Sequence, residues 1–193
     1  MTITPREAIA IGASSGAVEA VSAILTRLPE DYPLPIFVVV HVPPDRPSAL
    51  VDVFQAKSPL NIREAEDKEP IEPSCVYLAP PDYHLMIETE KLISLSSEEP
   101  VHYSRPAIDV LFETAADAYG AGLIGIVLTG SNDDGSAGLR CISQLGGATI
   151  VQCPNEAASP FMPNSAKAAC PEARTMNLEE IAEYLLNQGR TYD

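Results

Sequence analysis

The sequence predicts a doubly wound α/β protein, with a mostly parallel sheet, helices on both faces and an antiparallel hairpin at one edge. Short apolar runs alternate with amphipathic stretches at both ends of the chain. Two of these runs, Ile36–Val40 and Leu123–Leu128, have no polar side chain, as in parallel strands buried on both faces. The middle of the chain differs, because several short strands lie close together around the polar turn Glu88–Lys91.

The first half of the chain predicts a strand–helix–strand–helix series. The first strand covers Ala8–Ile11, and Val18–Leu28 follows with apolar residues at helical spacing. Ile36–Val40 is the second strand. Pro47–Lys57 is a helix candidate with its proline near the first turn.

The second half of the chain begins with the hairpin and then returns to alternation. The expected strands are Cys75–Leu78, His84–Ile87, Leu92–Leu95, Leu123–Leu128 and Ala148–Val151. The expected helices are Ile108–Tyr119, Ala137–Leu145 and Leu178–Asn187. We expect residues 1–193 to form one domain.

Three strand ends carry chemically useful side chains. In parallel α/β sheets the reactive residues lie beyond the carboxyl ends of the strands. Ser14 follows the first strand, His41 follows the second, and Asp134 lies in the polar run after Leu123–Leu128. A hydroxyl, an imidazole and a carboxylate are the nucleophile, the general base and the orienting acid of a serine hydrolase.

Each of these residues also has a purely structural interpretation. Ser14 is suited to cap the following helix, and Asp134 is suited to a turn or a helix N-cap. His41 could simply end a strand. His84 and His102 are expected to be structural or solvent-facing, and no histidine spacing typical of a metal site occurs. The coincidence of three such residues at three strand ends favours catalysis.

The loop Gly12–Gly16 allows two functional interpretations. It matches G-x-S-x-G between a strand and a helix, the pattern of a nucleophile elbow. It also looks like the start of a dinucleotide-binding domain, but the third glycine is missing and no tyrosine stands four residues before a lysine. The order Ser14, His41, Asp134 differs from that of α/β-hydrolases, which excludes that family and leaves the chemistry open.

With these residues in view, the chain resembles the catalytic domain of the chemotaxis receptor methylesterases, the protein-glutamate methylesterases of the CheB type. The shared motifs run in order over roughly Ala8 to Ala169. They are Ile9–Gly16, Val40–Pro44, Glu64–Asp67, Tyr77–His84, Arg105–Phe112, Leu128–Gly130 with Asp134–Gly135, and Met162–Pro163.

The resemblance implies a site and a substrate. Ser14 would be the nucleophile, His41 the base and Asp134 the acid, with the backbone N–H groups of Ser15 and Ser131 stabilising the oxyanion. We expect His41 Nε2 to face Ser14 Oγ, and Asp134 to meet the other ring nitrogen. The substrates implied are glutamate 5-methyl esters, and also glutamines, on the cytoplasmic helices of chemoreceptors. No cofactor or metal is expected.

The chain departs from the family pattern in ways that bear on substrate and control. Ser131 stands where the family has methionine, and Phe161 stands where glycine commonly precedes Met-Pro. A receiver domain usually precedes the esterase, so we expect an open site controlled by a separate receiver-domain protein or through substrate supply. The alternatives are an esterase for another substrate, and an inactive module that docks on a receptor or a methyltransferase.

Composition restricts the partners and the compartment. Asp and Glu number 27 against 12 Lys and Arg, for a formal net charge of −15, which disfavours nucleic acid and anionic lipid. No signal peptide or apolar run long enough to span a bilayer is present. The four cysteines are scattered without metal-site spacing, which is typical of reduced thiols. These features predict a cytoplasmic protein.

Overall fold

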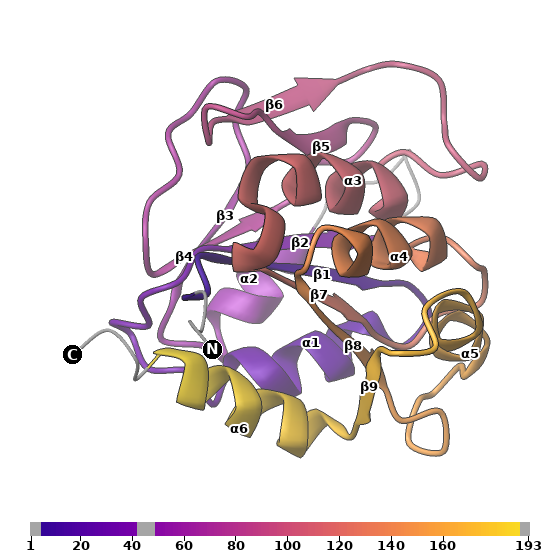
Figure 1. Cartoon of the computed structure of the whole chain (residues 1–193). Helices are drawn as coiled ribbons and strands as arrows, with labels where there is room; N and C mark the ends of the chain where they lie inside the picture. Colours follow the sequence, from indigo (N-terminus) through magenta and orange to yellow (C-terminus); the bar gives the residue numbers. More distant parts are fainter. Residues whose placement is uncertain (1–4, 42–48, 190–193) are drawn as a thin grey trace.

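The computed structural model, which describes residues 5–41 and 49–189, is built around one seven-stranded sheet (Figure 1). The strand order is β3-β4-β2-β1-β7-β8-β9, and every neighbouring pair is parallel. The strands are β1 (Ala8–Ala13), β2 (Ile36–Val40), β3 (Asn61–Glu64), β4 (Cys75–Leu78), β7 (Leu123–Val127), β8 (Ala148–Gln152) and β9 (Arg174–Met176). The predicted fold class is therefore confirmed.

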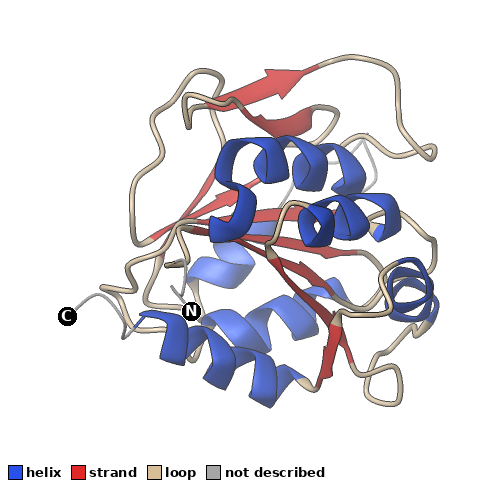
Figure 2. Ribbon diagram, in the orientation of Figure 1, coloured by secondary structure: helices blue, strands red, loops and turns tan. Residues whose placement is uncertain are grey.

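Helices cover both faces of the sheet (Figure 2). On one face lie α1 (Ala17–Leu25), α2 (Leu50–Gln55) and α6 (Leu178–Gly189). On the other lie α3 (Ile108–Tyr119), α4 (Ser136–Gln144) and α5 (Phe161–Ala169). A short 3₁₀ turn, Gly120–Gly122, joins α3 to β7.

Alternation along the buried strands divides the core into two layers. In β1, Ile9 and Ile11 pack with α1 and α6, while Ala8 and Ala10 pack with α3 and α4. Strands β2 and β7 flank β1 on opposite sides. Strands β2–β4 of the sheet lie on one side of β1 and β7–β9 on the other, so the strand order reverses direction at β1. A crevice at such a topological switch point is the usual place for a ligand in an open α/β sheet.

The predicted hairpin is antiparallel, but it does not extend the main sheet. Strands β5 (His84–Ile87) and β6 (Ile93–Ser96) form a separate two-stranded sheet. Leu85, Ile87 and Ile93 are buried in the same layer as α3, and the Ile87 N–H donates to Thr114 Oγ1 of that helix at 3.2 Å. The apolar side of the hairpin is thus buried against α3, so the hairpin does not need to pair with an edge strand of the main sheet to cover it.

Three short elements of the structure are not predicted by the sequence patterns. Strand β3 buries only Ile62 among its four residues, β9 has three residues, and α5 contains Pro163. The helix predicted over Pro47–Lys57 is observed as Leu50–Gln55; its first residues, like those that follow His41 in its motif, lie outside the described residues.

Two further predictions concern the cysteines and membrane-spanning segments. All four cysteines are free. Within the described ranges, none of the helices combines the length and apolar character needed to cross a membrane.

Candidate active site

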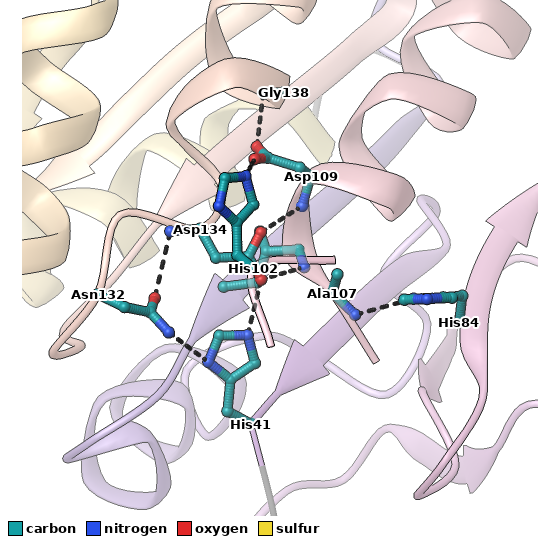
Figure 3. Close-up of polar contacts among 9 residues, drawn as sticks. His41, His84, His102, Ala107, Asp109, Asn132, Asp134 and Gly138 are labelled. Atoms are coloured by element: carbon teal, nitrogen blue, oxygen red, sulfur yellow. Dashed lines mark hydrogen bonds and ion pairs between the residues drawn. The ribbon is translucent and has the colours of Figure 1, made fainter. Parts of the chain in front are cut away.

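The structure brings the three predicted strand ends together at the switch point of the sheet. Ser14 follows β1 and donates its backbone N–H to Thr129 O, just beyond β7, at 2.9 Å. His41 follows β2 and donates its N–H to Ala13 O at 3.2 Å. Asp134 ends the loop between β7 and α4 and reaches the His41 ring (Figure 3).

Asp134 is fully buried, and its carboxylate accepts three hydrogen bonds. Oδ2 lies 2.7 Å from His41 Nε2 and accepts the Ile108 N–H at 2.7 Å, while Oδ1 accepts the Asp109 N–H at 2.9 Å. Both backbone donors belong to the first turn of α3, where the helix dipole favours negative charge. Among residues 5–41 and 49–189, the His41 imidazole is the basic side chain that pairs with this buried carboxylate.

The two ring nitrogens of His41 have different partners, which assigns their roles. Nε2–H donates to the Asp134 carboxylate, so Nδ1 carries the lone pair, and Asn132 Nδ2 lies 3.4 Å from it as a donor. The expectation that Nε2 faces Ser14 and Asp134 meets the other nitrogen is therefore wrong. The α3 N–H groups fix the carboxylate away from the residue 41 backbone, and Nε2, the nitrogen farther from the Cα, is the one that reaches it.

Hydroxyl groups tie the Ser14 loop to the loop after β7. Ser131 Oγ donates to Ser15 Oγ at 2.8 Å and lies 3.1 Å from Ser159 Oγ. Thr129 Oγ1 donates to Ser15 O at 2.7 Å and accepts the Ser159 N–H at 2.9 Å. Across the described ranges, the backbone N–H groups of Ser15 and Ser131 have no hydrogen-bond acceptor. Ser14 itself is half-buried.

Gly16 allows this loop to turn sharply into α1. It is the N-cap of the helix at φ +83°, a conformation that disfavours other residues. A Cβ placed there would lie 2.7 Å from Ala158 Cβ. Close approach between the Gly16 loop and the loop before α5 therefore depends on the glycine.

Two polar residues of the site, Asn132 and Asp109, were not singled out from the sequence. Asn132 Oδ1 accepts the Asp134 N–H at 3.2 Å while its amide meets the His41 ring. Asp109 Oδ1 accepts the Gly138 N–H of α4 at 2.7 Å, and Oδ2 lies 3.4 Å from His102 Nε2. Their position is the signal that the sequence offers: Asp109 lies inside the motif Arg105–Phe112, and Asn132 lies between Leu128–Gly130 and Asp134–Gly135.

The Asp109 carboxyl group has a raised pKa. It is 4% exposed, and burial raises its pKa from 3.8 to about 6. The Gly138 N–H and His102 oppose that rise in pKa, and the Asp134 carboxylate adds to it. The two neighbouring carboxylates are thus linked, since the Asp109 N–H donates to Asp134.

His84 is structural, as expected. It is 2% exposed, its Nδ1 accepts the Ala107 N–H at 3.2 Å, and its Nε2 donates to Glu99 O at 3.1 Å. These bonds hold β5 against the beginning of α3 (Figure 3). His84 therefore supports the helix end that holds Asp134.

A cavity of about 150 Å³ opens beside the His41 ring. Its lining residues come from the strand end of β2, the turn before β5 and the loop before α3. They are His41, Asp82, Pro100, Tyr103, Ser104, Arg105 and Pro106.

Known proteins are similar to this chain in sequence and in fold. Residues 9–185 match the family model of CheB methylesterase. A "Putative protein-glutamate methylesterase/protein-glutamine glutaminase" of Leptospira interrogans serogroup Icterohaemorrhagiae serovar copenhageni is 43% identical over 180 residues, 93% of each chain. The "Protein-glutamate methylesterase/protein-glutamine glutaminase 2" of Syntrophus aciditrophicus is 33% identical over 95% of this chain but only 54% of its own length.

A solved structure agrees with these relatives. The crystal structure of the Thermotoga maritima CheB methylesterase catalytic domain superposes with a TM-score of 0.90 at 30% identity, covering 95% of this chain and 99% of that one. The family match extends over nearly all described residues, and the fold agrees over the same length. The chain therefore belongs to the CheB methylesterase family.

Proposed function

We propose that this protein is a serine hydrolase that demethylates glutamate 5-methyl esters, and deamidates glutamines, on the cytoplasmic helices of chemoreceptors. The observation that carries the proposal is the buried Asp134–His41 pair at the strand end next to the Ser14 loop. The names of the Leptospira and Syntrophus relatives support the substrate class. The cytoplasm is the compartment in which such receptor helices are exposed.

Ser14, His41 and Asp134 form the proposed catalytic triad. Ser14 Oγ attacks the ester carbonyl carbon as His41 Nδ1 takes the hydroxyl proton. The Nε2–H group keeps its hydrogen bond to the Asp134 carboxylate, which holds the His41 tautomer and stabilises the imidazolium. The C–O bond to the leaving group then breaks, and Nδ1–H gives its proton to the departing oxygen, releasing methanol. A water molecule, deprotonated by Nδ1, then attacks the acyl carbon; the bond to Ser14 Oγ breaks, Nδ1–H returns its proton to Oγ, and glutamate is released. With a glutamine substrate the first leaving group is ammonia.

The developing oxyanion is stabilised by backbone donors. The N–H groups of Ser15 and Ser131 are the proposed donors, and Ser15 precedes α1, where the helix dipole favours negative charge. A backbone donor does not depend on its side chain, so serine at position 131 supplies the same group as any other residue. One donor of this kind is worth about 3–4 kcal/mol of barrier.

The whole of residues 1–193 acts, in this proposal, as one catalytic domain whose partner is the receptor. Nucleic acid and lipid are not partners, because the net charge of −15 opposes both.

The decisive experiment measures methanol released from a methylated receptor fragment by the purified protein. We expect release by the wild type and none above background by Ser14→Ala. Ser143→Ala is the matched control, because Ser143 lies on α4 and bonds to Glu172 away from the site. Hydrolysis of small esters without receptor hydrolysis would indicate an esterase for another substrate. Binding of the receptor without hydrolysis of either would indicate an inactive docking module.

A further inference from the structure

A strained turn stands beside the cavity at His41. Val101 and Ser104 pair across it, with the Val101 N–H donating to Ser104 O at 3.1 Å and the Ser104 N–H donating to Val101 O at 2.9 Å. The two central residues, His102 and Tyr103, have φ of +49° and +61°. Two successive residues of positive φ are the pattern of a type I′ turn, which favours Asn-Gly. Histidine and tyrosine are both disfavoured at positive φ, so the role of these two residues lies in their side chains.

The turn is held in place from both sides. His102 Nε2 lies 3.4 Å from Asp109 Oδ2, and Asp109 in turn donates its N–H to Asp134 (Figure 3). Arg105 Nη2 and Nε donate to Asp82 Oδ1 at 2.6 and 3.1 Å. Arg105 Nη1 donates to the carbonyl oxygens of residues 97 and 98 at 2.9 and 3.0 Å. The backbone of the turn is thus fixed relative to the triad.

Tyr103 points away from this support into solvent. Its side chain is 104% exposed, yet it lines the same cavity as His41. Large exposed apolar side chains in the described residues also include Tyr83, Leu145 and Phe161, and none of these three lines that cavity. A tyrosine on a rigid backbone offers a large amphipathic contact surface at low entropic cost, since only two torsions are lost on binding.

We propose that Tyr103 is a specificity-determining residue that contacts the polypeptide of the substrate next to the reacting side chain. This inference rests on the proposed function. A cavity of about 150 Å³ has room for about one side chain, whereas a substrate helix, about 10–12 Å across, is too wide to enter it and would meet the rim. Tyr103 stands at that rim. Its contact is uncharged, so the acidic surface of the enzyme does not oppose it.

The test compares two esters of the same chemistry. One is the methylated receptor fragment, and the other is N-acetyl glutamate 5-methyl ester, which has no polypeptide to reach the rim. For Tyr103→Gly we expect kcat/KM for the receptor fragment to fall about tenfold or more, mainly through KM, and kcat/KM for the small ester to change less than about twofold. Glycine also relieves the positive φ, so the melting temperature should be unchanged or higher.

Two further variants separate the aromatic contact from other effects. Tyr103→Phe keeps the ring and should stay near the wild type with both esters. Leu145→Ala removes an exposed apolar side chain at the far end of α4 and should change neither.

The results that overturn the proposal are specific. An equal fall of kcat/KM with both esters would mean that the site itself is disturbed, and an unchanged value for the receptor would mean that no contact exists. In both cases the wild type still hydrolyses the receptor, and the proposed function stands. Failure of the wild type to hydrolyse the receptor would refute the proposed function together with this inference.

Discussion

Replacing Asp134 by asparagine tests the electrostatic logic of the site, because the two side chains have the same shape. The carboxylate accepts from three donors at 2.7–2.9 Å and is fully buried. An amide offers one oxygen and one NH₂ group. If the NH₂ replaces Oδ2, it faces the Ile108 N–H and donates to His41 Nε2; if it replaces Oδ1, it faces the Asp109 N–H. Either orientation sets one buried donor against another.

The cost to stability follows from this mismatch. One unmatched buried donor costs about 1–3 kcal/mol, and loss of the charge at the α3 N-terminus about 0.3–1 kcal/mol. Asp134→Asn should therefore lower the free energy of unfolding by about 3 kcal/mol, or the melting temperature by about 6–12 °C for a chain of this length. The variant should remain folded at 25 °C, since the free energy of unfolding of such domains is about 5–15 kcal/mol.

The cost to activity is larger. In one orientation His41 is held with its proton on Nδ1, where it cannot accept the Ser14 proton, and in both the imidazolium loses its counter-charge. We expect kcat to fall about 10⁴-fold, less than for loss of Ser14 or His41. The assays are methanol release and thermal unfolding, with Asp133→Asn as the control, because Asp133 is exposed and adjacent. Turnover within tenfold of the wild type, or an unchanged melting temperature, would refute the reasoning.

Three other predictions follow from the site and the charge. Ser14→Ala and His41→Ala should each lower kcat about 10⁶-fold, and the double variant should lose little more; additive losses would show that the two do not act as a unit. The raised pKa of Asp109, about 6 against 3.8, means that the folded state binds its proton more tightly, so the stabilisation is complete below pH 4 and lost as pH rises through 6. The free energy of unfolding of Asp109→Asn, minus that of the wild type, should therefore rise by about 1–3 kcal/mol from pH 4 to pH 7. A difference that is flat with pH contradicts this. The second-order rate constant for association with an acidic receptor fragment should be unchanged or higher at higher salt, because screening over about 8–10 Å removes the repulsion between the two negative proteins. A steep fall of this rate constant with salt would show that local cations dominate.

The strands that place the site could be predicted because their patterns are local. Ile36–Val40 and the run from Leu123 have no polar side chain, and only a strand buried on both faces suits such a run. Parallel strands put their carboxyl ends at one edge, so the residues that follow them meet there. This rule predicts that Ser14, His41 and Asp134 lie at one edge as candidate site residues, and the family motifs contain the same three residues.

What the sequence alone determined was the fold class, the family and the position of these three residues after three strands of the sheet, since each depends on order along the chain. Only the tertiary structure decided which His41 nitrogen meets Asp134, because the Asp134 carboxylate is held by N–H groups of α3, 25 and 26 residues away along the chain. The hairpin was placed by the same kind of contact, its apolar side being covered by α3 rather than by a strand. The His102–Asp109 pair likewise joins a turn to a helix through groups whose approach no periodicity records. Side-chain alternation reports which face of an element is buried, whereas its partner on that face is set by packing across the whole molecule.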